Sequence, residues 1–245
     1  MKILIIVNVD WFIYSHRLPI ILEAKKKGYE IHIATKITDL AKKELLINQG
    51  IKFHELSFDR SGKKISRIIN IFFKILNLIH KLKPNILHLV TIQPILIGGI
   101  AGRIMGIKKI VYAISGLGHT FLSENLITRI RRLIILKSYQ LALGGKNRKV
   151  IFQNPEDHAL LSKVCSLSNK ETIIIPGSGV DLKKFNYSKV PESNPIVMMA
   201  SRLLVSKGVY EFIEAAKIVQ KKGLKIKFQL VGKPDKSNPL TIKKY

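Results

Sequence analysis

The feature that most constrains the fold is an alternation of short runs rich in β-branched residues with longer segments of helical periodicity. Near-continuous apolar runs of this length are typical of strands buried on both faces of a parallel sheet. Strands that alternate with helices predict parallel pairing through crossover helices. The seven predicted strands are Lys2–Asn8, Tyr29–Thr35, Phe53–Phe58, Ile86–Thr91, Lys109–Ser115, Lys149–Asn154 and Glu171–Pro176.

The clearest predicted helix runs from Ile65 to Leu82, where apolar residues recur at helical spacing. It stops before Pro84, which cannot continue a helix. With its neighbours it predicts a doubly wound, Rossmann-like α/β domain over residues 1–185.

The amino-acid composition changes at residues 186–194, which are polar, and this change predicts an interdomain linker. A second strand, helix and strand follow at Pro195–Ser201, Ser206–Lys222 and Lys225–Gly232. Two strands and one helix cannot bury a core by themselves. We therefore expect residues 195–245 to be an incomplete second Rossmann-like domain.

The formal net charge of +26 is compatible with nucleic acid, anionic membranes or polyanionic substrates as partners. Lysine is used heavily along the whole chain, so much of this charge is expected to be solvated surface. The sequence has no zinc-ligand spacing, RNP-like aromatic motif or arginine-rich arm, and we expect no nucleic-acid partner.

Compartment and membrane insertion are constrained by three features. The single Cys165 excludes a disulfide framework and fits a reducing cytoplasm. The N-terminus has no secretory signal. The segments Ile65–Leu82 and Ile86–Ile107 are both interrupted by charges or by proline and glycine, so neither predicts a spanning helix. We expect a cytoplasmic protein, soluble or peripheral on the inner face of the plasma membrane.

Two loops after predicted strands offer polar groups for a ligand. The loop after the first strand carries Asp10, Ser15, His16 and Arg17 ahead of a helix, with the only tryptophan beside them. The loop after the fifth strand carries Gly116, Gly118 and His119. A histidine at a strand tip can hydrogen-bond a sugar hydroxyl or carry a proton.

Two further loops carry residues suited to phosphate. Gly177 and Gly179 follow the seventh strand, and glycine lets the backbone approach a ligand or adopt positive φ. Arg202 and Lys207 lie between a strand and the start of a helix, where open α/β sheets bind ligands and a helix N-terminus favours phosphate. We predict a clamp for a diphosphate there.

Several motifs are absent from the sequence: Asp-x-Asp, the P-loop, Gly-x-Gly-x-x-Gly after the first strand, and Gly-x-Ser-x-Gly. We therefore predict no metal site, and the dinucleotide oxidoreductase and hydrolase readings lose their main support.

Together the segments KILIIVN, SHRLPI, SGLGHTF, PGSGVDLKKF, ASRLLVSKGVYEFIEAA and FQLVGKPD resemble glycosyltransferase family 4. These are retaining enzymes of the GT-B fold that act in bacterial capsule, O-antigen and lipopolysaccharide synthesis. The resemblance runs nearly the whole length. It implies sugar transfer from a nucleotide sugar, expected to be a UDP-sugar, to a lipid-linked saccharide acceptor, with no further cofactor and no metal.

The resemblance also implies residue roles. Arg202 and Lys207 would bind the donor diphosphate, the Gly177–Gly179 loop would lie in the interdomain cleft, and His119 would act near the donor sugar. The Asp10–Arg17 loop, with Gly116 and Gly118, would face the acceptor. The family's paired glutamates, seven residues apart, have no counterpart before Tyr245. We therefore expect a truncated second domain and little transferase activity for this chain.

A basic helix with an apolar stripe is predicted around residues 127–137. It suits an anionic bilayer, although for this helix alone an ordinary core-facing helix with a solvated basic face explains the pattern slightly better. Two other readings of function stay open. One is another GT-B enzyme, such as a sugar-nucleotide epimerase. The other is a non-catalytic remnant.

Overall fold

The computed structural model describes residues 1–58, 65–117, 126–189, 195–234 and 240–242. The chain divides into two compact units, Met1–Val180 and Asp181–Tyr245.

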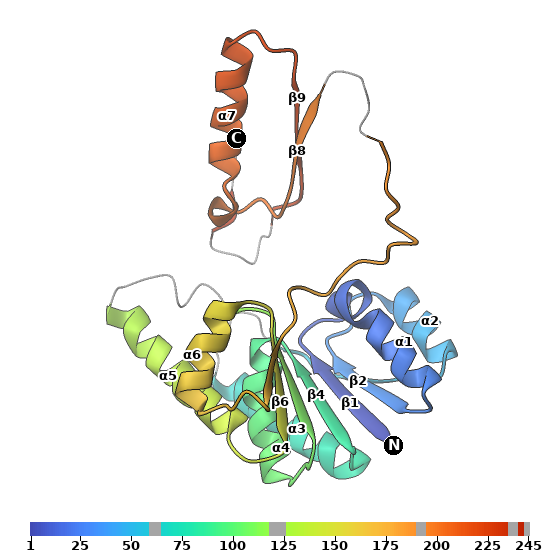
Figure 1. Ribbon diagram of the computed structural model, residues 1–245. Helices are drawn as coiled ribbons and strands as arrows, with labels where there is room; N and C mark the ends of the chain where they lie inside the picture. The colour runs from blue at the N-terminus through green and yellow to red at the C-terminus, as the bar shows by residue number, and fades with distance from the viewer. Residues whose placement is uncertain (59–64, 118–125, 190–194, 235–239, 243–245) are drawn as a thin grey trace. The chain divides into compact units, whose positions relative to one another are not determined.

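The first unit is a seven-stranded, all-parallel sheet with helices on both faces (Figure 1). The strand order is β3-β2-β1-β4-β5-β6-β7. The strands are β1 (Lys2–Val7), β2 (Glu30–Thr35), β3 (Lys52–Glu55), β4 (Ile86–Val90), β5 (Ile110–Ile114), β6 (Arg148–Phe152) and β7 (Thr172–Ile174). All seven lie inside or within one residue of the predicted runs, and the predicted α/β fold is confirmed.

Helices connect successive strands. They are α1 (Leu18–Lys26), α2 (Leu40–Asn48), α3 (Ile65–Leu82), α4 (Gly99–Ile104), α5 (Leu126–Leu143) and α6 (Pro155–Cys165). Two π-helical turns, η1 (Ile13–Arg17) and η2 (Pro94–Gly98), precede α1 and α4. The bounds of α3 are those that the apolar spacing predicts.

Two hydrophobic layers sandwich the sheet. On one face α3, α4, α5 and α6 pack around Tyr112, Tyr139 and Phe152, which are fully buried. On the other face η1, α1 and α2 cover β1, β2 and part of β4 (Figure 1). The second layer is the smaller one and leaves the β5–β7 side of that face partly exposed, since Ile173 and Ile175 are about half exposed.

The second unit contains two parallel strands, β8 (Ile196–Ala200) and β9 (Lys227–Val231), joined through the short turn η4 (Val205–Lys207) and α7 (Val209–Lys221). Leu203, Val209 and Ile242 form its small core. Gly232 is required where the strands end, because a Cβ there would lie 1.9 Å from the Ser201 carbonyl oxygen. At the start of the unit, Asp181 accepts from the Lys183 N–H at 2.9 Å and caps a turn.

Candidate functional site

The strand order of the first unit reverses between β1 and β4, and this switch point is where open parallel sheets bind ligands. The connections that leave β1 and β4 lead into η1 and η2. A π-helical turn is rare and often marks a functional site. The sheet topology and the local helix geometry therefore both favour a ligand site near the carboxyl ends of β1 and β4.

A pocket of about 420 Å³ opens beside η1, which is a volume typical of small-molecule sites. It lies on the face that carries η1 and α1, because Ala113 belongs to that layer and pairs with Ile151 across the ladder. The pocket is lined by His16, Arg17, Pro19, Ile20, Ala113, Ile114, Ile151, Gln153, Ile175, Pro176, Gly177, Ser178 and Gly179. It thus brings together residues from two loops that are about 160 positions apart in the sequence.

Arg17 brings an uncompensated cation to the pocket. Its Nε atom is buried without a hydrogen-bond partner, and the guanidinium has no carboxylate within ion-pair distance in the described part of the chain. Its only charge-related contact there is with the ring of Phe12, 5.8 Å from the ring centroid. Burial lowers the pKa of Arg17 from its ordinary value, although the group remains charged. A half-buried, unpaired cation is costly, and an anionic ligand would offset that cost.

His16 is the second polar side chain that η1 places at the pocket. Its ring stacks on Phe12 with centroids 4.3 Å apart and planes 6° apart, and its Nδ1 lies 2.6 Å from Ser15 Oγ. Burial and the neighbouring Arg17 charge lower the pKa of His16 from 6.5. His16 is therefore neutral near pH 7. Ser15 does not line the pocket itself, but it contacts His16, which does.

The Gly177–Gly179 turn forms the opposite wall. Gly177 and Gly179 have φ angles of +72° and +70°, values that other residues adopt only with strain. Ser178, which lies between the two glycines, also lines the pocket. Both glycines thus form a wall of the pocket in the same unit as His16 and Arg17, and their role at the donor diphosphate stays a prediction.

Asp10 lies away from the pocket. Its side chain is fully buried, and it accepts hydrogen bonds from the Thr38 N–H at 2.6 Å, the Asp39 N–H at 3.0 Å and the Thr38 hydroxyl. Burial raises the pKa of this carboxyl, but these hydrogen bonds outweigh burial and the net pKa is lowered. In place of the predicted ligand contact, Asp10 fastens the start of η1 to the loop after β2.

The remaining sequence-predicted residues of the first unit fall in the loop after β5. Gly116 has a φ of +141° and does not line the pocket. Gly118 and His119 lie outside the described residues.

Two residues at the switch point escaped the sequence reasoning. His88 on β4 is buried, its Nε2 has no partner among the described residues, and burial together with the Arg17 charge lowers its pKa to about 4. Thr91 follows β4 with a φ of +74°, which is strained for a β-branched residue, and its buried hydroxyl has no partner there either. Neither position carries a spacing signal, because both lie within an apolar run. Gln153, which follows β6 and lines the pocket, also escaped the sequence reasoning.

Arg202 and Lys207 belong to the second unit. Both are exposed on the connection from β8 to α7, and Gly208 with φ +77° turns the chain into that helix. This connection is anchored by hydrogen bonds from Val205 N–H to Leu240 O and from Ile242 N–H to Leu203 O. The two cations therefore flank the turn that leads to a helix N-terminus, as the sequence predicts.

No cluster of three or more His, Cys, Asp or Glu side chains suited to a metal ion occurs in residues 1–58, 65–117, 126–189, 195–234 and 240–242. Within the same ranges, every helix is too short or too polar to cross a membrane.

The fold is that of a doubly wound α/β protein, and its pocket places the Arg17 guanidinium beside the carboxyl ends of β5, β6 and β7. A model of the glycosyl transferase 4-like family matches residues 2–154, more than half of the chain. The chain belongs to this family, and the resemblance seen in the sequence is confirmed.

Curated relatives are consistent with this membership. The chain is 25% identical over 238 residues to the N,N'-diacetylbacillosaminyl-diphospho-undecaprenol alpha-1,3-N-acetylgalactosaminyltransferase of Campylobacter jejuni, covering 92% of this chain and 61% of the relative. It is 23% identical over 232 residues to the capsular polysaccharide biosynthesis glycosyltransferase CapM of Staphylococcus aureus, covering 90% and 58%. The chain thus spans about 60% of the length of these relatives.

Solved structures share the fold. A glycosyltransferase from Rickettsia africae superposes with a TM-score of 0.63 at 20% identity, covering 94% of this chain and 60% of that one. UDP-N-acetylglucosamine 2-epimerases have the same architecture, for example that of Listeria monocytogenes with a TM-score of 0.61 at 16% identity, covering 97% and 63%. At these identities the likeness concerns the fold alone.

Proposed function

We propose that this chain forms the acceptor side and the start of the donor side of a glycosyltransferase for cell-surface polysaccharide. The enzyme moves a sugar from a UDP-sugar to a saccharide carried on a lipid diphosphate, with retention of anomeric configuration. Family membership supports the reaction class. The single observation that carries the site assignment is Arg17, which is half-buried in the pocket beside η1 and has no ion-pair partner among the described residues.

The chemistry of the pocket suits a saccharide diphosphate. A guanidinium offers planar N–H donors for phosphate oxygens. His16, Gln153 and Ser178 add polar groups for sugar hydroxyls, and the apolar side chains of Ile20, Ile151 and Ile175 complete the lining. In this proposal the acceptor's diphosphate contacts Arg17 and its saccharide lies between η1 and the Gly177–Gly179 wall.

On the donor side we assign the diphosphate of the UDP-sugar to Arg202 and Lys207. The leaving nucleoside diphosphate gains negative charge as the sugar–phosphate bond breaks, and fixed cations stabilise that charge in the transition state. His119, at the end of the glycine loop after β5, is proposed to contact the donor sugar. No metal ion is required by this scheme.

The site assignment is tested by calorimetric titration with an acceptor mimic, an N-acetylhexosamine joined through a diphosphate to a short prenyl chain. Arg17→Met retains most of the side-chain volume and removes the charge. We expect its affinity for the mimic to fall about 10- to 100-fold, the range for hydrogen bonds to a charged group. Lys26→Met, which removes an exposed cation from α1, serves as the matched control and should bind like the wild type.

If the Arg17→Met and Lys26→Met variants bound the mimic with equal affinity, the assignment of Arg17 to the acceptor site would be wrong. Arg17→Lys guards against misfolding, because it keeps the charge and should bind with intermediate affinity. Failure of the wild type to bind the mimic overturns the proposed function itself.

An epimerase is the second candidate, favoured by the fold shared with UDP-N-acetylglucosamine 2-epimerases. It predicts turnover of a UDP-sugar when no acceptor is present. Nuclear magnetic resonance of UDP-N-acetylglucosamine incubated with the protein distinguishes the two, because a transferase leaves that sugar's configuration at carbon 2 unchanged.

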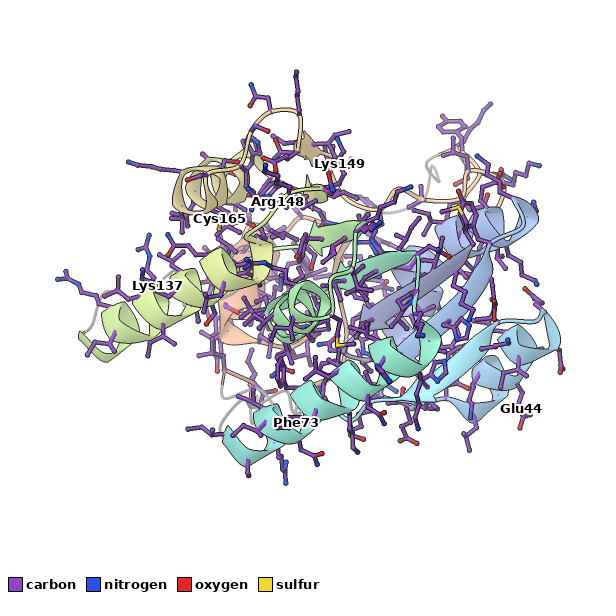
Figure 2. All side chains as sticks on the ribbon, turned by 90° about the horizontal axis from the view of Figure 1, so that it is seen from below. Glu44, Phe73, Lys137, Arg148, Lys149 and Cys165 are labelled. Carbon is purple, nitrogen blue, oxygen red and sulfur yellow. The ribbon has the colours of Figure 1, made fainter. Side chains whose placement is uncertain are left out.

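We further propose that the first unit docks on an anionic bilayer that carries the acceptor, at the inner face of the plasma membrane. Large apolar side chains that are more than half exposed lie on α3 (Ile65, Ile69, Phe73) and α5 (Ile130, Leu133, Ile134). Phe73 and Lys137 mark the outer surfaces of these helices in Figure 2. Basic residues accompany the apolar ones, and the formal net charge of +26 complements an anionic surface.

Sedimentation with phosphatidylglycerol-containing vesicles tests this docking. Replacing Leu133 and Ile134 together by serine should lower the bound fraction several-fold at moderate salt. The matched control replaces Leu45 and Ile47, which are exposed on α2, by serine and should bind like the wild type. Binding that is equal in both double variants would refute the docking surface.

A further inference from the structure

Ser15 and His16 form a short hydrogen-bond chain inside η1 whose polarity can be worked out. The Ser15 hydroxyl lies 2.8 Å from the backbone carbonyl oxygen of Trp11 and 2.6 Å from His16 Nδ1. A serine hydroxyl has a single proton, and a carbonyl oxygen can only accept.

Only one assignment satisfies both contacts. Ser15 donates its proton to the Trp11 carbonyl, so its oxygen accepts from an N–H on His16 Nδ1. The opposite polarity would place two oxygen lone pairs against each other at 2.8 Å. Neutral His16 is therefore the Nδ1–H tautomer, the less common form of an unconstrained histidine, and its Nε2 carries a lone pair.

The ring is also held against rotation. It stacks on Phe12, with Trp11 edge-on at 6.3 Å between centroids and 65° between planes. A flip of the ring would move Nδ1 away from Ser15 and break the chain of hydrogen bonds. Nε2 has no partner among the described residues, and His16 lines the pocket next to Arg17.

We propose that Ser15 holds His16 as the Nδ1–H tautomer, so that the pocket selects ligands presenting a hydroxyl group beside an anionic group. The hydroxyl donates to His16 Nε2 and the anion binds Arg17. This inference rests on the proposed function and deepens it, because it makes Ser15 a positioning residue and His16 a specificity residue for the saccharide of the acceptor.

The tautomer can be measured without any ligand. Long-range proton–nitrogen correlation spectra of the 15N-labelled protein at pH 7.5 distinguish a protonated Nδ1 from a protonated Nε2. We expect His16 to show the Nδ1–H pattern, and exposed His80 on α3 to show the usual Nε2–H pattern in the same spectrum. Ser15→Ala should shift His16 toward Nε2–H.

The binding arm uses the acceptor mimic and inorganic pyrophosphate. Ser15→Ala should weaken the mimic about tenfold, the worth of one hydrogen bond, and leave pyrophosphate affinity unchanged. Arg17→Met should weaken both probes. Ser138→Ala is the matched control, since Ser138 likewise donates to the carbonyl four residues earlier, Ile134 O, at 2.8 Å. It should change neither affinity.

An Nε2–H tautomer for His16 in a protein that binds the mimic overturns this inference and leaves the proposed function standing. Unchanged mimic affinity in Ser15→Ala also overturns it. An Nδ1–H tautomer combined with selective loss of mimic affinity in Ser15→Ala supports it.

Discussion

The buried carboxylate of Asp10 is expected to be a main stabilising contact of the site's framework, and Asp10→Ala measures its contribution. The variant removes the acceptor for three hydrogen bonds, from the N–H and hydroxyl of Thr38 and the N–H of Asp39. Each hydrogen bond to a charged group contributes about 1.5–3 kcal/mol. Thr38 is exposed, so water satisfies part of what is lost. We therefore expect the free energy of unfolding to fall by about 3 kcal/mol, less than the roughly 4.5–9 kcal/mol that three such bonds would contribute without this compensation by water.

Urea unfolding followed by tryptophan fluorescence is the assay, because Trp11 is the only tryptophan and adjoins Asp10. Glu44→Ala on the exposed surface of α2, labelled in Figure 2, is the control and should stay within about 0.5 kcal/mol of the wild type. The effect also has a pH signature. The folded-state pKa of Asp10 is lowered from 3.8, so its contribution is full above that value and is lost as the pH falls through the folded-state pKa. If Asp10→Ala and Glu44→Ala unfold at the same urea concentration at pH 7, the reasoning is wrong.

Two other predictions concern buried titratable groups. The pKa of His88 is about 4 in the folded protein and about 6.5 in the unfolded chain, so the unfolded state binds more protons between these pH values. Lowering the pH from 6.5 to 4 should therefore reduce the free energy of unfolding of the wild type by about 3 kcal/mol more than that of His88→Leu. Urea titrations at several pH values measure this difference. Arg148, nearly buried, donates to the Glu171 carboxylate at 2.9 Å, and Arg148→Met should cost about 2–3 kcal/mol by stranding that carboxylate. Lys149→Met, its exposed neighbour in Figure 2, should cost less than about 0.5 kcal/mol, and equal losses would contradict the assignment.

Much of the fold follows from patterns visible in the sequence. Continuous apolar runs located all seven strands of the first unit, because parallel strands are covered on both faces. The periodicity of Ile65–Leu82 located α3 residue for residue. The strand order could not be predicted in this way, because apolar runs carry no information on which neighbour each strand pairs with. The switch point between β1 and β4 emerged only from the structure.

The site was predicted in part. The loop residues His16, Arg17, Gly177 and Gly179 line one pocket, since polar and glycine positions after parallel strands converge at the carboxyl edge of the sheet. Asp10 belongs to the same loop, yet its carboxylate is buried and accepts hydrogen bonds from Thr38 and Asp39, long-range contacts that spacing does not reveal. The tautomer of His16 likewise depends on hydrogen-bond geometry that no sequence pattern encodes.

The most direct test of the central claim is residue-resolved titration of the 15N-labelled protein with the acceptor mimic. The account predicts saturable shifts concentrated on His16, Arg17 and Gly177–Gly179, the walls of the pocket beside η1, with weaker changes on α2 and at the amino ends of the strands. Shifts confined to surfaces away from this pocket, or none in a folded protein, would contradict the assignment of the acceptor site and with it the proposed function.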